Sequence, residues 1–152
     1  MKEPSLLNLS ASAEASYRFS WFRTYNHSMS IRIDHDKFNV TKVIAREVAG
    51  HGGYESGKLT MDRTFYWSAG QYGAFLDKVN SMKFWTTAEQ PSKFDPQYGG
   101  TDGAQWLLEG VAKDHPYHYL EVWTPESGSM RELGILVLRQ CGLLDQATRD
   151  IY

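Results

Sequence analysis

Apolar and polar residues alternate in four separate runs between Tyr17 and Tyr66. The first run, YRFSWFRTY, places Tyr17, Phe19 and Trp21 on one side and the residues between them on the other, which is the two-residue period of a β-strand. The same alternation recurs in three later runs, each bounded by turn-forming residues. We therefore expect strands at 17–25, 29–33, 38–48 and 58–66, with a tight turn at 34–37.

Two segments have the spacing of amphipathic helices. Ser68 followed three residues later by Gln71 is a capping-box signature, and apolar residues then recur at helical spacing, which predicts a helix over about 69–82. Ser129 and Glu132 form a second signature of this kind, and the apolar stripe after them continues to the last leucines of the chain. We expect both helices to pack on the sheet.

A hairpin is predicted between the two helices. Its strands are 104–113 and 117–125, closed around 114–115, with Lys113 opposite Pro116. In this register one side of the hairpin is aliphatic and is expected to face the helices, whereas the other side is aromatic. The aliphatic set is Leu107, Val111, Leu120 and Val122, and the aromatic set is Trp106, Tyr117, Tyr119 and Trp123 around Glu121.

Together these elements predict one α+β domain. Its core is a single antiparallel sheet of about six strands, in the chain order ββββαββα, with two helices packed on one face. The length of 152 residues and the 41% hydrophobic content suffice for one core without metals or disulfides. We expect residues 1–16 to be a flexible N-terminal arm, 17–144 to be the domain and 145–152 to be a C-terminal tail.

Charge and cysteine content exclude several classes of function. A net charge of -2 and a pI near 6.2 leave no basic field to attract nucleic acid. Cys141 is the only cysteine, so neither an intrachain disulfide nor a cysteine-based zinc site can form, and its apolar neighbours predict burial. No apolar run reaches the about 18 residues of a membrane span. The N-terminal residues lack the pattern of a signal peptide, which predicts a cytoplasmic protein, or a periplasmic one if a leader has been removed.

The stretch GGTDGAQWLLEG, residues 99–110, is glycine-rich without being a phosphate loop. No Lys-Ser/Thr pair follows the glycines, and the downstream residues alternate as a strand instead of opening a helix. A nucleophile elbow would need a serine or cysteine at the turn. Asp102 and Gly103 are therefore expected to make a sharp entry into the strand. The preceding segment, 86–103, is long for a compact domain, and such loops often carry function.

The histidines and carboxylates form no recognised catalytic set. No two histidines have the helical spacing of a metalloprotease, and His118 and Glu121 fall on opposite faces of one strand, so we expect neither a metal nor a cofactor. His51 lies among glycines near Glu55, where a flexible loop and a close approach to a ligand are both consistent with the sequence. Serines sit in caps and turns, and no carboxylate pair has glycosidase spacing. We expect a protein that is not an enzyme.

The aromatic face of the hairpin is the strongest candidate for a binding site. Aromatic side chains beside a charge are enriched in protein-binding hot spots. We expect binding of another protein, with an immunity- or inhibitor-like protein and its toxin or effector as one instance. The expected binding residues are Trp106, Tyr117, Tyr119, Glu121, Trp123 and Asp102.

Three alternatives remain. The aromatic face can be a second core layer. The same rings can line a concavity for a small molecule or a glycan. A hydrolase can use His51, Asp102 or His118.

The segments DGAQWLLEG (102–110) and YHYLEVWTP (117–125), followed by an apolar helix ending in CGLL, resemble a group of small bacterial proteins. In that group DGAxWxLEG, YHxxxxWxP and a final leucine-rich helix follow a GGYExG-like loop, which corresponds to 52–57 here. The resemblance covers 17–144. The group has no assigned function, so the resemblance implies a shared fold and no catalytic residue.

Overall fold

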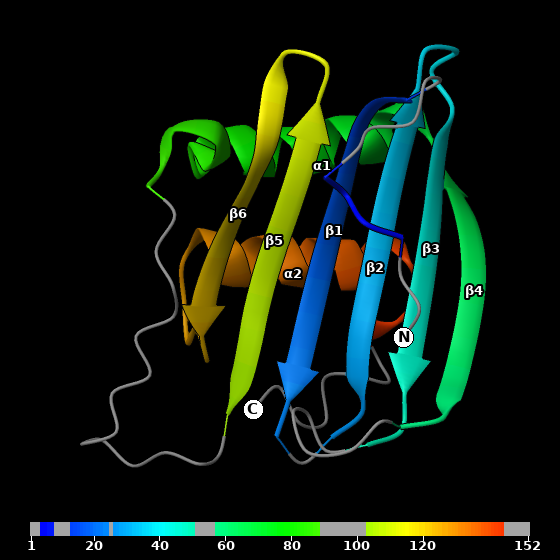
Figure 1. The fold of residues 1–152 in the computed structure, drawn as a ribbon, viewed down its shortest axis with the longest axis vertical. Coiled ribbons are helices and arrows are strands. Elements are labelled where there is room, and N and C mark those ends of the chain that lie inside the picture. Colours follow the sequence, from blue (N-terminus) through cyan, green and yellow to red (C-terminus); the bar gives the residue numbers. More distant parts are fainter. Residues whose placement is uncertain (1–3, 8–12, 25, 51–56, 89–102, 145–152) are drawn as a thin grey trace.

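A computed structural model of the chain describes residues 4–7, 13–24, 26–50, 57–88 and 103–144. Six strands form one antiparallel sheet in the order β4-β3-β2-β1-β5-β6, and two helices cover one of its faces (Figure 1). The predicted α+β architecture and its element order are confirmed. The elements are β1 Ala13–Arg23, β2 Ser28–Asp36, β3 Thr41–Val48, β4 Leu59–Trp67, α1 Ala69–Ser81, a 3₁₀ turn Phe84–Thr86, β5 Ala104–Ala112, β6 His115–Trp123 and α2 Ser129–Gln140.

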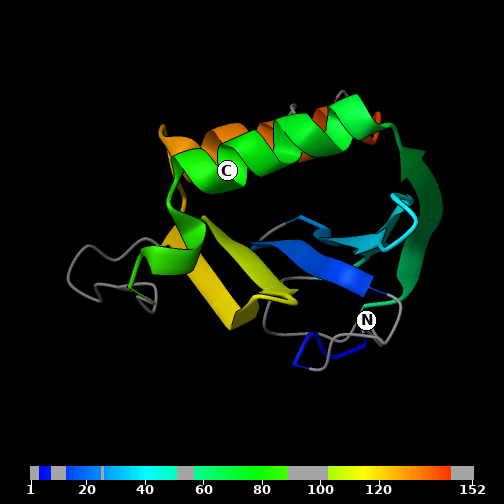
Figure 2. The ribbon, with the colours of Figure 1, turned by 90° about the horizontal axis from the view of Figure 1, so that it is seen from above.

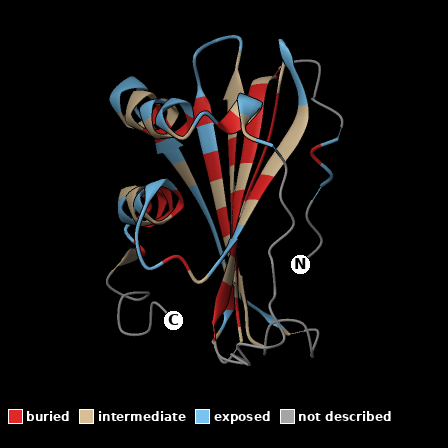
Figure 3. Ribbon diagram, turned by 90° about the vertical axis from the view of Figure 1, so that its left-hand side faces the viewer, coloured by how far each residue is buried: buried red, intermediate tan, exposed pale blue. Residues whose placement is uncertain are grey.

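Both helices lie on the same side of the sheet and run across the strands, as Figures 1 and 2 show. The alternation in β1 sends Tyr17, Phe19 and Trp21 toward the helices, where all three are buried. Buried residues concentrate along the middle of the sheet and on the sides of the helices that face it (Figure 3). The hydrophobic core is therefore the layer between the sheet and the two helices. In the described part of the chain no helix is long and apolar enough to cross a membrane.

Of residues 1–16, expected to form a flexible N-terminal arm, the structure describes 4–7 and 13–16. Residues 13–16 already belong to β1, and Leu6 is 1% exposed. Figure 2 shows the segment 4–7 against the sheet face opposite the helices. The carbonyl oxygen of Pro4 accepts hydrogen bonds from Arg18 Nη1 and Arg32 Nη1, at 3.4 and 3.2 Å. This segment therefore covers part of that face, and the predicted tail at 145–152 lies outside the described residues.

The hairpin of β5 and β6 has a different register from the predicted one. The turn consists of residues 113–114, Ala112 pairs with His115, and the register shifts between Gly110 and Ala112. The predicted register, with Lys113 opposite Pro116, would place Trp106 opposite Trp123. Beyond the irregularity Trp106 instead pairs with Val122, so that register is wrong. Because side chains alternate across a strand, a slip of one residue moves each side chain to the other face. Leu107 and Val111 consequently lie on the face away from the helices and Trp106 on the face toward them.

The two helices begin differently. At α1 the predicted capping box is present: Ser68 Oγ accepts a hydrogen bond from the backbone N–H of Gln71 at 3.3 Å, and the Gln71 side chain accepts one from Ser68 N at 3.0 Å. At α2 the N-cap is Gly128, with φ 90°, and no side chain caps the helix. The predicted capping box at Ser129 is therefore wrong. Glu132 instead accepts a hydrogen bond from Lys78 of α1, at 2.6 Å.

The second helix approaches the sheet closely at Gly134. The ring of Trp106 lies 5.3 Å from that of Trp21 and 5.6 Å from that of Phe19, measured between centroids. A Cβ atom on Gly134 would lie 2.3 Å from Cζ3 of Trp106, closer than real atoms approach. The missing side chain at this position therefore allows α2 to rest directly on the indole.

Candidate functional site

The sheet face opposite the helices, called the open face below, carries polar and aromatic side chains that neither helix covers. Its two halves differ in character. Around β6 the side chains are aromatic and acidic, whereas across β2, β3 and β4 they are mainly charged and surround a pocket. We call the first half the edge patch; it consists of Tyr117, Tyr119, Glu121 and Trp123.

The edge patch follows from the alternation along β6. Tyr119 pairs with Glu109, Glu121 with Leu107 and Trp123 with Gln105, so these β6 residues share the open face. Strand β6 is the last strand of the sheet, and Trp123 is 36% exposed. The rings of Tyr117 and Tyr119 lie 6.4 Å apart between centroids. The structure thus brings together four of the six predicted binding residues on one side of an edge strand.

A partly buried ion pair between Arg18 and Glu109 supports one end of the edge patch. Glu109 is 6% exposed, and its two carboxylate oxygens accept hydrogen bonds from Nε and Nη2 of Arg18, each at 2.6 Å. The hydroxyl of Tyr117 donates a third hydrogen bond to the same carboxylate, at 2.9 Å. A bidentate arginine–carboxylate pair has a specific geometry and is stronger than a neutral hydrogen bond. The pair therefore holds the Tyr117 ring in place, and both oxygens of Glu109 are already occupied.

Trp106 does not belong to the site, which corrects the prediction. Its side chain is 1% exposed and packs in the core beneath α2, as the revised hairpin register requires. Asp102, the sixth predicted residue, lies outside the described residues. Its neighbour Gly103 contacts the patch: a Cβ atom there would lie 2.7 Å from Cζ2 of Trp123. A glycine at this position therefore leaves room for the Trp123 indole.

Of the three residues that a hydrolase would use, only His118 is among the described residues. His51 and Asp102 lie outside the described residues. His118 pairs with Gly110 and points to the helix side, where its ring is 5.0 Å from that of Phe84. His118 and Glu121 therefore lie on opposite faces of β6. In the part of the chain that the structure describes, no group of three or more His, Cys, Asp or Glu side chains can hold a metal ion.

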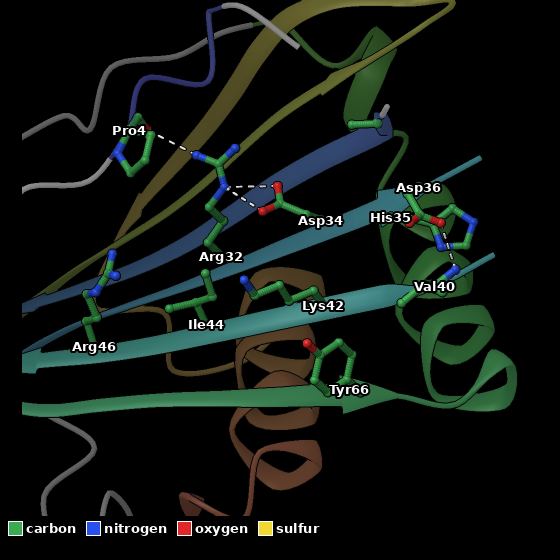
Figure 4. A pocket seen from close by; sticks show the side chains of 11 residues that line it. Pro4, Arg32, Asp34, His35, Asp36, Val40, Lys42, Ile44, Arg46 and Tyr66 are labelled. Carbon is green, nitrogen blue, oxygen red and sulfur yellow. Dashed lines mark hydrogen bonds and ion pairs between the residues drawn. The ribbon is translucent and has the colours of Figure 1, made fainter. Parts of the chain in front are cut away.

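The second half of the open face contains a pocket of about 500 Å³ that sequence reasoning did not identify. Charged and aromatic side chains from three neighbouring strands line it, with Pro4 at one side (Figure 4). In the sequence these residues form the polar side of alternating strands. A solvent-exposed sheet face produces the same pattern, so the pattern does not indicate a pocket. The pocket is visible only once the strands and the segment 4–7 are assembled.

Comparisons with known proteins found no matching family model, no matching curated sequence and no matching solved structure. The resemblance of the two tryptophan motifs to a group of small bacterial proteins therefore stays a prediction.

Proposed function

We propose that this chain is a non-enzymatic protein-binding module and that the edge patch is its contact surface. The observation that supports the proposal is the position of four aromatic and acidic side chains together on an edge strand, on the face that neither helix covers. Tyrosine and tryptophan dominate binding hot spots, because they bury a large area with few rotatable bonds. An exposed edge strand also offers backbone groups to a partner.

The patch favours a partner that presents basic side chains. Glu121 accepts a hydrogen bond from the neutral amide of Gln105 and has no cationic partner among the described residues. Tyrosine and tryptophan rings attract lysine and arginine through their faces. An immunity- or inhibitor-like role, with a toxin or effector that exposes lysines or arginines, is one instance of such a partnership.

A small-molecule or glycan binder is the second candidate. A concavity between the sheet and the segment 86–103 would suit such a ligand, and most of that segment lies outside the described residues. The pocket on the open face is lined by none of the edge-patch residues. A protein partner can use an edge strand without a deep pocket, and the edge patch therefore supports this candidate less well.

Photo-crosslinking followed by affinity measurement tests the proposal. A benzoylphenylalanine at Tyr119 should crosslink a specific protein in the cells of origin, and the same group at Phe38, an exposed aromatic 72% accessible on the β2–β3 turn, should not. With the purified partner, Trp123→Ala should weaken binding by at least about 30-fold, as expected for a hot spot of about 2 kcal/mol. Phe38→Ala is the matched control and should bind normally.

Folding of each variant is checked by circular dichroism and urea denaturation. Trp123 is partly exposed, so its alanine variant is expected to stay folded. The proposal fails if both crosslinking positions capture the same proteins, or if folded Trp123→Ala binds the partner as tightly as the original chain.

A further inference from the structure

We infer that the pocket over β2, β3 and β4 is a binding site for a small organic anion, with Lys42 and Tyr66 as the groups that hold its charged end. The site is separate from the edge patch and does not depend on the protein-binding proposal. Three cationic side chains, those of Arg32, Lys42 and Arg46, line the pocket together with two carboxylates, those of Asp34 and Asp36.

Both carboxylates in the wall are already occupied by groups of the chain itself. Asp34 accepts hydrogen bonds from Nε of Arg32 at 2.9 Å and from Oγ of Ser16 at 2.7 Å. Asp36 Oδ1 accepts the backbone N–H groups of Phe38 and Val40, at 2.8 and 3.0 Å. These bonds hold both carboxylates in place: the charge of Asp34 is paired with Arg32, and Oδ1 of Asp36 accepts two backbone N–H groups.

Lys42 is the cation without a carboxylate partner. It pairs with Asp34 across β2 and β3, but no ion pair or hydrogen bond joins its amine to any of the described residues. Arg32 is held by Asp34 and by the Pro4 carbonyl, and Arg46 is paired with Asp62 at 3.0 Å. The positive charge available to a ligand is therefore concentrated at Lys42, and the paired guanidinium groups of Arg32 and Arg46 also line the pocket.

Tyr66 adds a neutral donor beside the amine. It lies directly opposite Lys42 in the pairing of β3 with β4, so both side chains stand next to each other on the open face. The Tyr66 side chain is 68% exposed, and Figure 4 shows it at the β4 side of the pocket. An ammonium and a phenol at adjacent positions can donate hydrogen bonds to the same carboxylate or phosphate.

The rest of the lining indicates an apolar body for the ligand. Ile44 lies between Lys42 and Arg46 on the same side of β3, and Val40 and Pro4 also line the pocket. A volume of about 500 Å³ is within the range of about 300–1,000 Å³ that is typical of small-molecule sites. A carboxylate or phosphate attached to a ring or a short hydrocarbon fits this combination of aliphatic floor and cationic rim.

Binding of simple probe anions tests the inference. The intact chain, labelled with ¹⁵N, is titrated with benzoate, phenyl phosphate and the neutral analogue benzamide. At least one anion should give saturable shifts at Lys42, Ile44 and Tyr66 with a Kd of about 1 mM or tighter, whereas benzamide should not. The tighter of the two anions identifies the preferred head group. Lys42→Met should weaken binding by at least about tenfold, the loss expected for a charged hydrogen bond.

Lys37→Met is the matched control, because Lys37 lies at the nearby β2–β3 turn and does not line the pocket. It changes the net charge by the same amount and should leave the affinity within about twofold. Tyr66→Phe keeps the ring and should weaken binding by several-fold. Equal losses in the two lysine variants, benzamide binding as tightly as the anions, or an absence of saturable shifts in the pocket would each overturn the inference.

Discussion

Gly134 carries no side chain at the point where α2 rests on Trp106, and this determines how close the helix comes to the sheet. The indole is held between Phe19 and Trp21, so it cannot swing away to admit another group. In a closely packed core one added methyl group is resisted by all of its neighbours. The lack of a side chain on Gly134 therefore allows α2 to bury Trp106. The sequence alone predicts that Trp106 belongs to the binding face.

We predict that Gly134→Ala lowers the free energy of unfolding by about 1–2 kcal/mol. Its Cβ would lie 2.3 Å from Trp106 and 2.7 Å from Phe19. Overpacking of this kind costs about 1–3 kcal/mol, and the higher helix propensity of alanine returns at most about 1 kcal/mol. Urea denaturation followed by tryptophan fluorescence measures the difference.

The matched control is Gly73→Ala in α1, where a Cβ would meet nothing within 4 Å. This variant should be unchanged or more stable by up to about 1 kcal/mol. If the two alanine variants had equal stability, α2 would not lie on Trp106 as described.

The two helices show that similar local signatures can have different structural outcomes. Ser68 with Gln71 and Ser129 with Glu132 both have the capping-box pattern, yet only the first pair makes the reciprocal hydrogen bonds. At α2 the chain enters through Gly128 in a conformation with φ 90°, so Ser129 becomes the first helical residue. Glu132 is then drawn to Lys78 of the neighbouring helix. Packing of α2 on α1 and the sheet therefore overrides the local signal.

We predict that Ser68→Ala costs about 1 kcal/mol of stability, because a backbone N–H at the start of α1 loses its acceptor. Ser129→Ala should change the stability by less than about 0.5 kcal/mol, since its side chain does not cap α2. Thermal denaturation followed by circular dichroism at 222 nm measures both changes. Equal losses in the two variants would show that Ser129 caps its helix after all.

Among the described residues, three ionisable side chains of the core have a pKa that burial raises. Burial raises the pKa of Tyr72 to about 12 and the pKa of Cys141 to about 12. Burial also raises the pKa of Tyr17, and Tyr72 nearby adds to the effect. All three side chains lie in the layer between the sheet and the helices. The stability of the whole domain therefore depends on the pH of the solution.

We predict that the protein loses stability as the pH rises above about 9. The ordinary pKa values are 9.0 for the thiol and 10.0 for the phenols, so the unfolded chain releases these protons before the folded chain does. The stabilisation is complete below about pH 9 and is lost progressively as the pH approaches the raised values near 12. Urea denaturation at a series of alkaline pH values measures this decline.

Tyr72→Phe keeps the ring that stacks on His35 but removes one of these protons. It should reduce the slope of the unfolding free energy against pH by up to about 1.4 kcal/mol per pH unit, the value for one proton. Tyr66→Phe removes a hydroxyl from an exposed side chain and is the control. A slope that is the same in the original chain and in Tyr72→Phe would contradict this account.

Local patterns were enough to predict the elements of this protein. Strands follow from side-chain alternation over two residues, and helices from apolar spacing over three or four, so neither requires knowledge of distant residues. The chain order of strands and helices, the cap of α1 and the outward position of Tyr117, Tyr119, Glu121 and Trp123 on their strand could all be obtained in this way. These four residues all lie on β6, so the alternation along that one strand determines which face they occupy.

Features that depend on how distant segments meet could not be obtained from those patterns. The irregularity between Gly110 and Ala112 shifts the hairpin by one residue, and that shift places Trp106 in the core. The position of β1 between β2 and β5, the cover provided by Pro4 and the pocket around Lys42 also arise only in the assembled sheet. Register and close packing are set by contacts between residues far apart in the chain, and a pattern read along a single strand does not contain them.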